Sequence, residues 1–273
     1  MDVHRDSGCA CLRPGRSMTL PSWERPRFVA GGGNARIFFV AYGNFTQLPA
    51  CAAAPDLQDY RSNGLPLQVE ARRLRRDELP GLSIAGGQME KLLRLESNEQ
   101  FEAMLAAPEC LVVQGEQVDP RDLNYLRDTI GWLAWWFDHG AEVVLDVQRL
   151  RLYDAASWWL DLFAPLPPRW LNHFLILSAE EPGGQWLHTR GLRKFGRPDL
   201  SIHQVEREQQ DTVIEMLQRL AVLQVEGGII EEGQGIQMTG LPNDLTCHHG
   251  GAINDPLFNN LHVEICRPSK FSY

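Results

Sequence analysis

Residues 186–223 read WLHTRGLRKFGRPDLSIHQVEREQQDTVIEMLQRLAVL, and this stretch contains both patterns on which the fold depends. Its first part, Trp186 to Val205, predicts two strands separated by a turn, because Gly191 and Gly196 permit backbone conformations that other residues resist. From Glu206 to Leu223, apolar residues recur every three or four positions, which predicts a helix with one apolar face. The stretch therefore places neighbouring strands directly before an amphipathic helix.

The same two patterns alternate along the rest of the chain. Further strands are predicted at 37–42, 65–74, 111–113, 143–152, 174–177, 245–249 and 261–266. Further helices are predicted at 97–107, 119–140 and 155–163, the second opening with Asp119 as N-cap and Pro120 at the first helical position. Hairpin-like neighbours near the end of the chain argue against a doubly wound sheet. We therefore expect an α+β fold with a mixed or mainly antiparallel sheet, or sheets, and two principal helices packed on them.

The domain organisation follows from one breaker run, Pro165-Leu166-Pro167-Pro168. It divides an N-terminal half, 18–168, from a C-terminal half, 169–273, and the two halves form either separate domains or one continuous domain. We expect residues 1–17 to form a disordered tail. Met18 is an alternative to Met1 as the true start.

Composition and charge limit the class of partner. The chain has 273 residues and a formal net charge of −9, which argues against a general nucleic-acid binder. No window approaches the roughly 20 apolar residues of a membrane span. The six cysteines form no CxxC pair, and the first residues lack a continuous apolar stretch. We expect a cytoplasmic protein with reduced thiols that binds neither nucleic acid nor membranes.

Familiar catalytic motifs are missing from the sequence. It has no phosphate-binding loop, no dinucleotide fingerprint, no GxSxG elbow and no HExxH helix. We therefore predict no cofactor and name no catalytic residue.

One polar cluster near the carboxyl end contains residue types that ligate zinc. Alternate positions of the expected strand place His262, Glu264 and Cys266 on one face, and His248 and His249 are close enough in sequence to lie on a neighbouring strand. Strict alternation is also what a hairpin with a solvated polar face predicts, so both interpretations stay open.

Tryptophans are concentrated in one third of the chain and suggest a partner-binding surface. The apolar stripe of the 119–140 helix already supplies a core face, so not all of its tryptophans fit that face. Tryptophan is also enriched at interface hot spots. The candidates for partner contact, against the alternative of core packing, are Trp132, Trp135, Trp136, Trp158 and Trp159.

Four cations lie in the segment between the two strands of the opening stretch. A functional interpretation makes them an anion clamp, which could hold a phosphorylated small molecule. The alternative is that they are solvated or paired with acidic residues. These cations are Arg190, Arg193, Lys194 and Arg197.

The same segment carries a resemblance. Thr189-Arg190-Gly191-Leu192 followed by Phe195-Gly196-Arg197-Pro198-Asp199 resembles a signature of uncharacterised bacterial domain families, in which a Thr-x-Gly-Leu/Met turn leads to Phe-Gly-x-Pro-Asp/Glu. Val144-Leu145-Asp146, with Trp158 after it, is similar to an earlier part of those families. The resemblance covers roughly the second half of the chain and implies a bacterial, cytoplasmic α+β protein with no agreed activity. Some small bacterial families of this character serve as immunity or accessory proteins for secreted toxins.

Two hypotheses about function result. The first is a non-catalytic bacterial protein-binding protein, such as an immunity or adaptor protein that binds a basic toxin or a secretion-system component. The alternative is a metal-dependent hydrolase that uses the His/Glu/Cys cluster near the carboxyl end.

Overall fold

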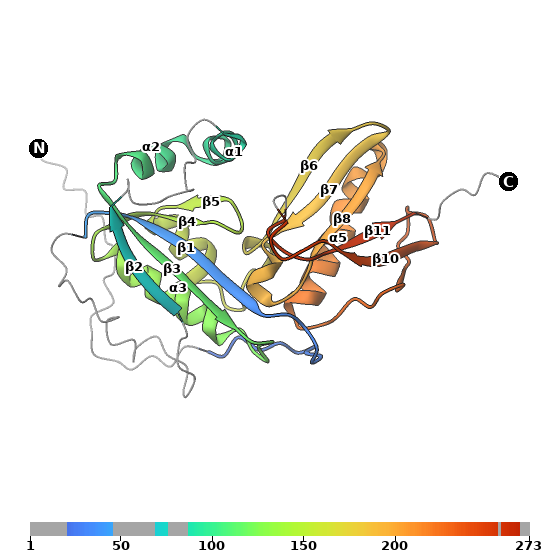
Figure 1. Ribbon diagram of the computed structural model, residues 1–273, viewed down its shortest axis with the longest axis horizontal. Helices are drawn as coiled ribbons and strands as arrows, with labels where there is room; N and C mark the ends of the chain where they lie inside the picture. Colours follow the sequence, from blue (N-terminus) through green and yellow to red (C-terminus); the bar gives the residue numbers. More distant parts are fainter. Residues whose placement is uncertain (1–20, 46–68, 76–86, 256–257, 268–273) are drawn as a thin grey trace, which may run out of the picture.

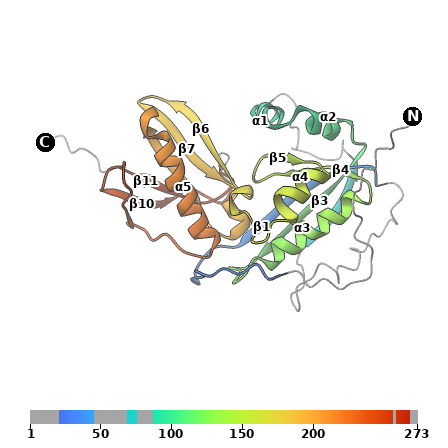
Figure 2. The ribbon, with the colours of Figure 1, turned by 180° about the vertical axis from the view of Figure 1, so that it is seen from behind.

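Two β-sheets with helices packed against them form the protein. The computed structural model describes residues 21–45, 69–75, 87–255 and 258–267. Figure 1 shows the first sheet on the left and the second on the right. Figure 2 shows the molecule from the other side, where α3 and α5 lie in front of the sheets. The predicted α+β fold is confirmed. The helices are α1 (Gln88–Glu96), α2 (Asn98–Ala106), α3 (Asn124–Phe137), α4 (Ala155–Trp158) and α5 (Gln210–Val225).

The first sheet has the order β2-β3-β1-β4-β5, and all of its pairings are antiparallel. Its central strand, β1, is apolar from Ile37 to Tyr42, where both of its faces are covered. Ile37 and Phe39 pack into a core with α3, whereas Val40 and Tyr42 pack into a second core with α2. Its strands are β1 (Ala35–Gly43), β2 (Val69–Arg75), β3 (Glu109–Gln117), β4 (Ala141–Asp146) and β5 (Arg151–Tyr153).

The second sheet has the order β6-β7-β8-β11-β10-β9. Among its described pairings only β8 and β11 run parallel, with Asp199 opposite His262. Helix α5 covers one face through Val213, Met216 and Leu217. Its strands are β6 (Leu175–Glu181), β7 (Gly184–Arg190), β8 (Asp199–Val205), β9 (Gly235–Ile236), β10 (Leu245–Gly250) and β11 (His262–Cys266).

Three expected elements differ from the structure. The helix predicted at 155–163 is α-helical only to Trp158 and continues as a π-helix, Trp159–Phe163. The strand predicted at 143–152 is two strands, β4 and β5, because the Asp146 carboxylate accepts the backbone N–H groups of Gln148 (3.1 Å) and Arg149 (3.0 Å) and turns the chain. The helix predicted from Asp119 begins at Asn124, because the Asp119 carboxylate accepts the Gly31 N–H (2.8 Å) and pairs with a distant arginine instead of capping the helix. At Asp146 and Asp119 a carboxylate therefore binds backbone N–H groups, of a turn in the first case and of a distant segment in the second.

Buried polar contacts join the two sheets. The Lys194 ammonium, between β7 and β8, donates to the Asp146 carboxylate at the end of β4, and both side chains are buried. Arg149 donates to the Tyr153 hydroxyl (2.6 Å) and to the Phe174 carbonyl (3.2 Å), which precedes β6. One cluster of buried apolar side chains also includes residues of both sheets. The predicted division near residue 168 falls between the two sheets, and the predicted disordered tail at 1–17 lies outside the described residues.

No helix in the described ranges is at once long enough and apolar enough to cross a bilayer.

Replacing Lys194 by Met should lower the free energy of unfolding by about 3–5 kcal/mol, because it leaves a buried carboxylate without its partner charge. Urea unfolding measures this loss. Adding Asp146→Asn, which keeps an acceptor for the turn, should recover part of it in the double variant. Strict additivity of the two single effects would contradict a direct ion pair.

Candidate functional site

The turn between β7 and β8 is closed by side chains of the Thr189-to-Asp199 motif. The Thr189 hydroxyl donates to the Asp199 carboxylate (2.9 Å) and accepts the Leu200 N–H (2.8 Å). Asp199 also accepts the Leu192 N–H (3.2 Å) and the Asn260 amide (2.8 Å), which comes from the loop before β11. Gly191 has a φ of 113°, a conformation that favours glycine. The motif therefore fixes the backbone of the second sheet.

Two of the four cations of the predicted anion clamp are buried and paired within the fold. Lys194 is fully buried on Asp146. Arg197 is buried and donates to the carbonyls of Gly228 (3.1 Å) and Gly227 (2.8 Å) as well as pairing with Asp119 (3.2 Å). The clamp is therefore wrong for Lys194 and Arg197, because their charges are neutralised within the fold.

The other two cations of the predicted clamp are less completely covered, although Arg193 is still buried, at 9% exposed. Arg193 donates to the carbonyls of Asn259 (2.8 Å) and Ile253 (3.3 Å). Arg190 is half-buried, and desolvation lowers its pKa. An anion-binding role for these two residues stays a prediction.

Asp199 is an unusual carboxyl group because it is fully buried. Desolvation raises its pKa to about 6, against the effect of its hydrogen bonds from Asn260, Leu192 and Thr189. The folded protein therefore holds this proton more tightly than the unfolded chain does.

The contribution of Asp199 to stability should be complete at pH values below its ordinary pKa of 3.8 and should be lost as the pH rises through about 6. Asp199→Asn removes the titration. The free energy of unfolding of the natural protein, minus that of the variant, should therefore fall by about 2–3 kcal/mol over this range. Chemical unfolding at several pH values measures the difference. A difference that rises with pH would contradict a proton held in the fold.

Three of the five candidate partner-binding tryptophans lie in the core. Trp132, Trp136 and Trp158 are almost fully buried, so partner contact is wrong for these three. The reason is that α3 is covered on two sides, by the first sheet and by α4, where the Trp158 indole N–H donates to the Ile130 carbonyl (3.0 Å).

The other two candidate tryptophans reach the surface to different extents. Trp135 is half-buried and stacks on His139 at 3.5 Å between ring centroids. Trp159 is 42% exposed and packs on Phe163 at 4.6 Å. Partner contact by these two stays a prediction.

Trp159 belongs to a group of exposed apolar side chains, which we call the apolar rim. Within the described residues, four of the exposed large apolar side chains fall between residues 159 and 171. The Asn172 amide, next to the last of them, donates to the Asp161 carbonyl (2.9 Å), which holds both ends of the segment together. The apolar rim consists of Trp159 (42% exposed), Leu160 (65%), Leu166 (63%) and Leu171 (47%).

The apolar rim continues into a groove between β6 and the start of α5, which we call the β6 groove. Its volume is about 390 Å³, and Leu171 lines it together with Leu175, Ile176 and Ile214. Strand β6 is the outermost strand of its sheet among the described strands, and no described strand pairs with its outer edge. Only Trp159 of this surface was predicted from the sequence. The available signal for the rest was the run WLDLFAPLPPRWL (159–171), whose apolar residues follow neither a helical nor a strand period.

The five residues of the predicted metal cluster lie on adjacent strands but on different faces. β10 and β11 pair as expected, with His248 opposite Glu264 on the face that also carries His262 and Cys266. His249 projects from the other face and contacts the Ile230 carbonyl through Nε2 (2.7 Å).

The side chains of this cluster have other partners. His248 contacts Glu232 through Nδ1 (2.8 Å), and His262 stacks on Phe258 at 4.5 Å. In the part of the chain that the structure describes, no three His, Cys, Asp or Glu groups are arranged to hold a metal ion. Metal-assisted hydrolysis there stays a hypothesis with no geometric observation in its favour.

No family model, curated protein or solved structure matches the chain. The functional assignment therefore depends on the geometry of the site itself.

The adjacent residues Trp158 and Trp159 provide a matched test of burial. Trp158→Ala should lower the free energy of unfolding by about 3–5 kcal/mol, because it opens a cavity in the core. Trp159→Ala should change it by less than about 1 kcal/mol, because its ring is partly in solvent. Denaturant unfolding of both variants measures the contrast, and equal losses would show that Trp159 is a core residue.

Proposed function

We propose that this chain is a non-catalytic protein-binding protein that holds an extended, basic segment of a partner along the outer edge of β6. The observation that carries this proposal is that Leu171 of the apolar rim lines the β6 groove, beside a strand edge that no described strand occupies. Exposed apolar groups in one place favour an interaction surface, whereas single exposed residues need no explanation.

The edge of β6 supplies the hydrogen-bonding part of such a surface. An outermost strand presents backbone N–H and C=O groups, to which an added strand can pair. Leu175, Ile176 and Leu177 are half-buried, so they offer apolar contact without being part of a closed core. A partner strand would cover these residues and the β6 groove together.

The net charge of the chain favours a basic partner. Glu180 near the end of β6 and Glu208 and Asp211 near the start of α5 are exposed, as are the cations Arg169 and Arg207. The acidic excess is that of the whole chain, which has a net charge of −9. Acidic surfaces increase the rate at which basic partners associate. In this proposal the chain works as an immunity or adaptor protein, whose role is to hold a basic toxin or secretion-system component.

Site-specific photo-crosslinking in the native host tests this proposal. A crosslinking amino acid at Leu171, in the apolar rim, should capture one predominant basic protein, and the yield should fall as salt increases. The matched control is Leu95, which is 83% exposed on α1 of the other half and should not capture that protein.

The variant Leu171→Arg should reduce recovery of the same partner about tenfold or more, because it adds positive charge and removes apolar contact. Identical captures at Leu171 and Leu95, or a partner that contacts neither the apolar rim nor β6, would refute the proposed surface.

A further inference from the structure

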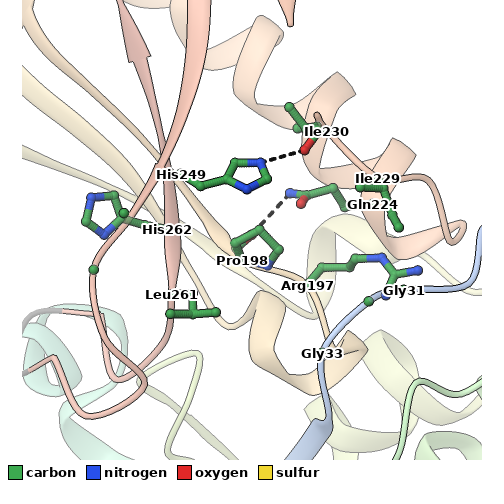
Figure 3. Close-up of a pocket in the computed structure, with 13 residues that line it drawn as sticks. Gly31, Gly33, Arg197, Pro198, Gln224, Ile229, Ile230, His249, Leu261 and His262 are labelled. Carbon is green, nitrogen blue, oxygen red and sulfur yellow. Dashed lines mark hydrogen bonds between the residues drawn. The ribbon is translucent and has the colours of Figure 1, made fainter. Parts of the chain in front are cut away.

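A second cavity lies toward the other edge of the second sheet, away from β6, at the ends of β10 and β11. Figure 3 shows it between the segment Gly31–Gly33, the end of α5 and the ends of β10 and β11 that face each other. Its volume is about 390 Å³, within the roughly 300–1,000 Å³ typical of small-molecule sites. Because β6 and β10 are separated by three strands in the sheet order, this cavity is distinct from the surface proposed for the protein partner.

The walls of the cavity are apolar, and parts of them are bare backbone. Pro198, Ile229, Ile230 and Leu261 supply the apolar side chains. A Cβ atom at Gly33 would lie 3.7 Å from its nearest neighbour, which is ordinary contact, so the packing of the fold does not require glycine there. The missing side chain keeps the cavity open and lets a flat molecule approach the backbone.

Gln224 gives the cavity a hydrogen-bond acceptor without a partner. The residue is fully buried, and its Nε2 donates to the Pro198 carbonyl (3.2 Å). Its Oε1 has no partner among the described residues. A buried acceptor without a donor costs free energy, so this atom is a point at which a ligand N–H would be favoured.

His249 adds a second acceptor at the same cavity. Its Nε2 lies 2.7 Å from the Ile230 carbonyl. Because a carbonyl only accepts, Nε2 must carry a proton, and in the tautomer with a single ring proton Nδ1 is the acceptor. In Figure 3 the side chains of His249 and Gln224 lie next to each other.

Among the described residues that line the cavity, the one arginine or lysine is not available to an anionic ligand. Arg197 is buried, and its donors are directed to Asp119 and to backbone carbonyls. The combination of acceptors, apolar walls and a neutralised arginine therefore favours an uncharged ligand with N–H donors over a phosphate or carboxylate.

We propose that this cavity binds an uncharged, amino-substituted nitrogen heterocycle of nucleobase or nucleoside size. Its amino group donates to Gln224 Oε1 and its second donor reaches His249 Nδ1, while the ring packs against Ile229, Ile230 and Leu261. Binding there gives the protein a small-molecule ligand in addition to its proposed protein partner.

Saturation-transfer NMR and calorimetry with named compounds test the proposal. The probes are adenine, cytosine, adenosine and cytidine at about 1 mM, a concentration that detects weak binding. Purine, which lacks the exocyclic amino group, and adenosine 5′-monophosphate are the comparison compounds. At least one amino-substituted probe should bind, and its counterpart without the amino group or with the phosphate should bind about tenfold more weakly.

Variants of the protein locate the binding. Gln224→Met should weaken binding about tenfold, because it removes the acceptor at nearly constant volume. Gln218→Met, at a glutamine of the same helix that lines the β6 groove, is the matched control and should leave affinity unchanged. If Gln224→Met does not fold, the double variant Gly33→Ala and Gly250→Ala decides the question, because it adds two methyl groups to the wall at ordinary contact distances.

Absence of binding by all four amino-substituted probes would overturn the proposal. Equal binding to the natural protein and to the variants that alter the cavity would also overturn it. Neither result would affect the proposed protein partner, whose test depends on Leu171 at the other edge of the sheet.

Discussion

The buried ion pair between Lys194 and Asp146 is the contact on which the arrangement of the two sheets depends. Asp146 ends β4 and turns the chain toward β5, while Lys194 lies in the turn that joins β7 to β8. Neither charge can be buried alone without a large penalty. Each sheet therefore supplies the charge that the other needs, and the apolar contacts around the pair depend on the sheets being in this position.

Buried arginines also join segments that are distant in the sequence. Arg197 joins the carbonyls after α5 to Asp119, and Arg25 donates to carbonyls of Gln224 and Val225 at the end of that helix. A guanidinium group suits this role because its five N–H groups can satisfy several carbonyls at once. Arg25 and Arg197 thus contribute to the interior of the fold.

The sequence predicts local structure better than it predicts which side chains are accessible. The run Ile37–Tyr42 and the helical spacing from Glu206 to Leu223 identify β1 and α5, because hydrophobic period depends on local geometry. The parallel pairing of β8 with β11 could not be predicted, because the two strands are far apart in the sequence.

The errors in the predicted sites have a common physical cause. The anion clamp required the charges of Lys194 and Arg197 to be accessible, and partner contact by Trp136 required one face of α3 to be free; the alternatives, pairing with acidic residues and core packing, are what the structure shows. Both expectations depend on what covers a segment, which nearby residues do not encode. The apolar rim was missed for the same reason, except at Trp159.

The position of β11 has a consequence for how the chain is made. This strand follows β9 and β10 in the sequence, yet it lies between β8 and β10 in the sheet. During synthesis on the ribosome, β8 therefore has an open edge until residues 262–266 emerge, and β10 cannot take its final place before then. The second sheet is therefore complete only after β11 has been made, and until then the edge of β8 is open to pairing with neighbouring chains.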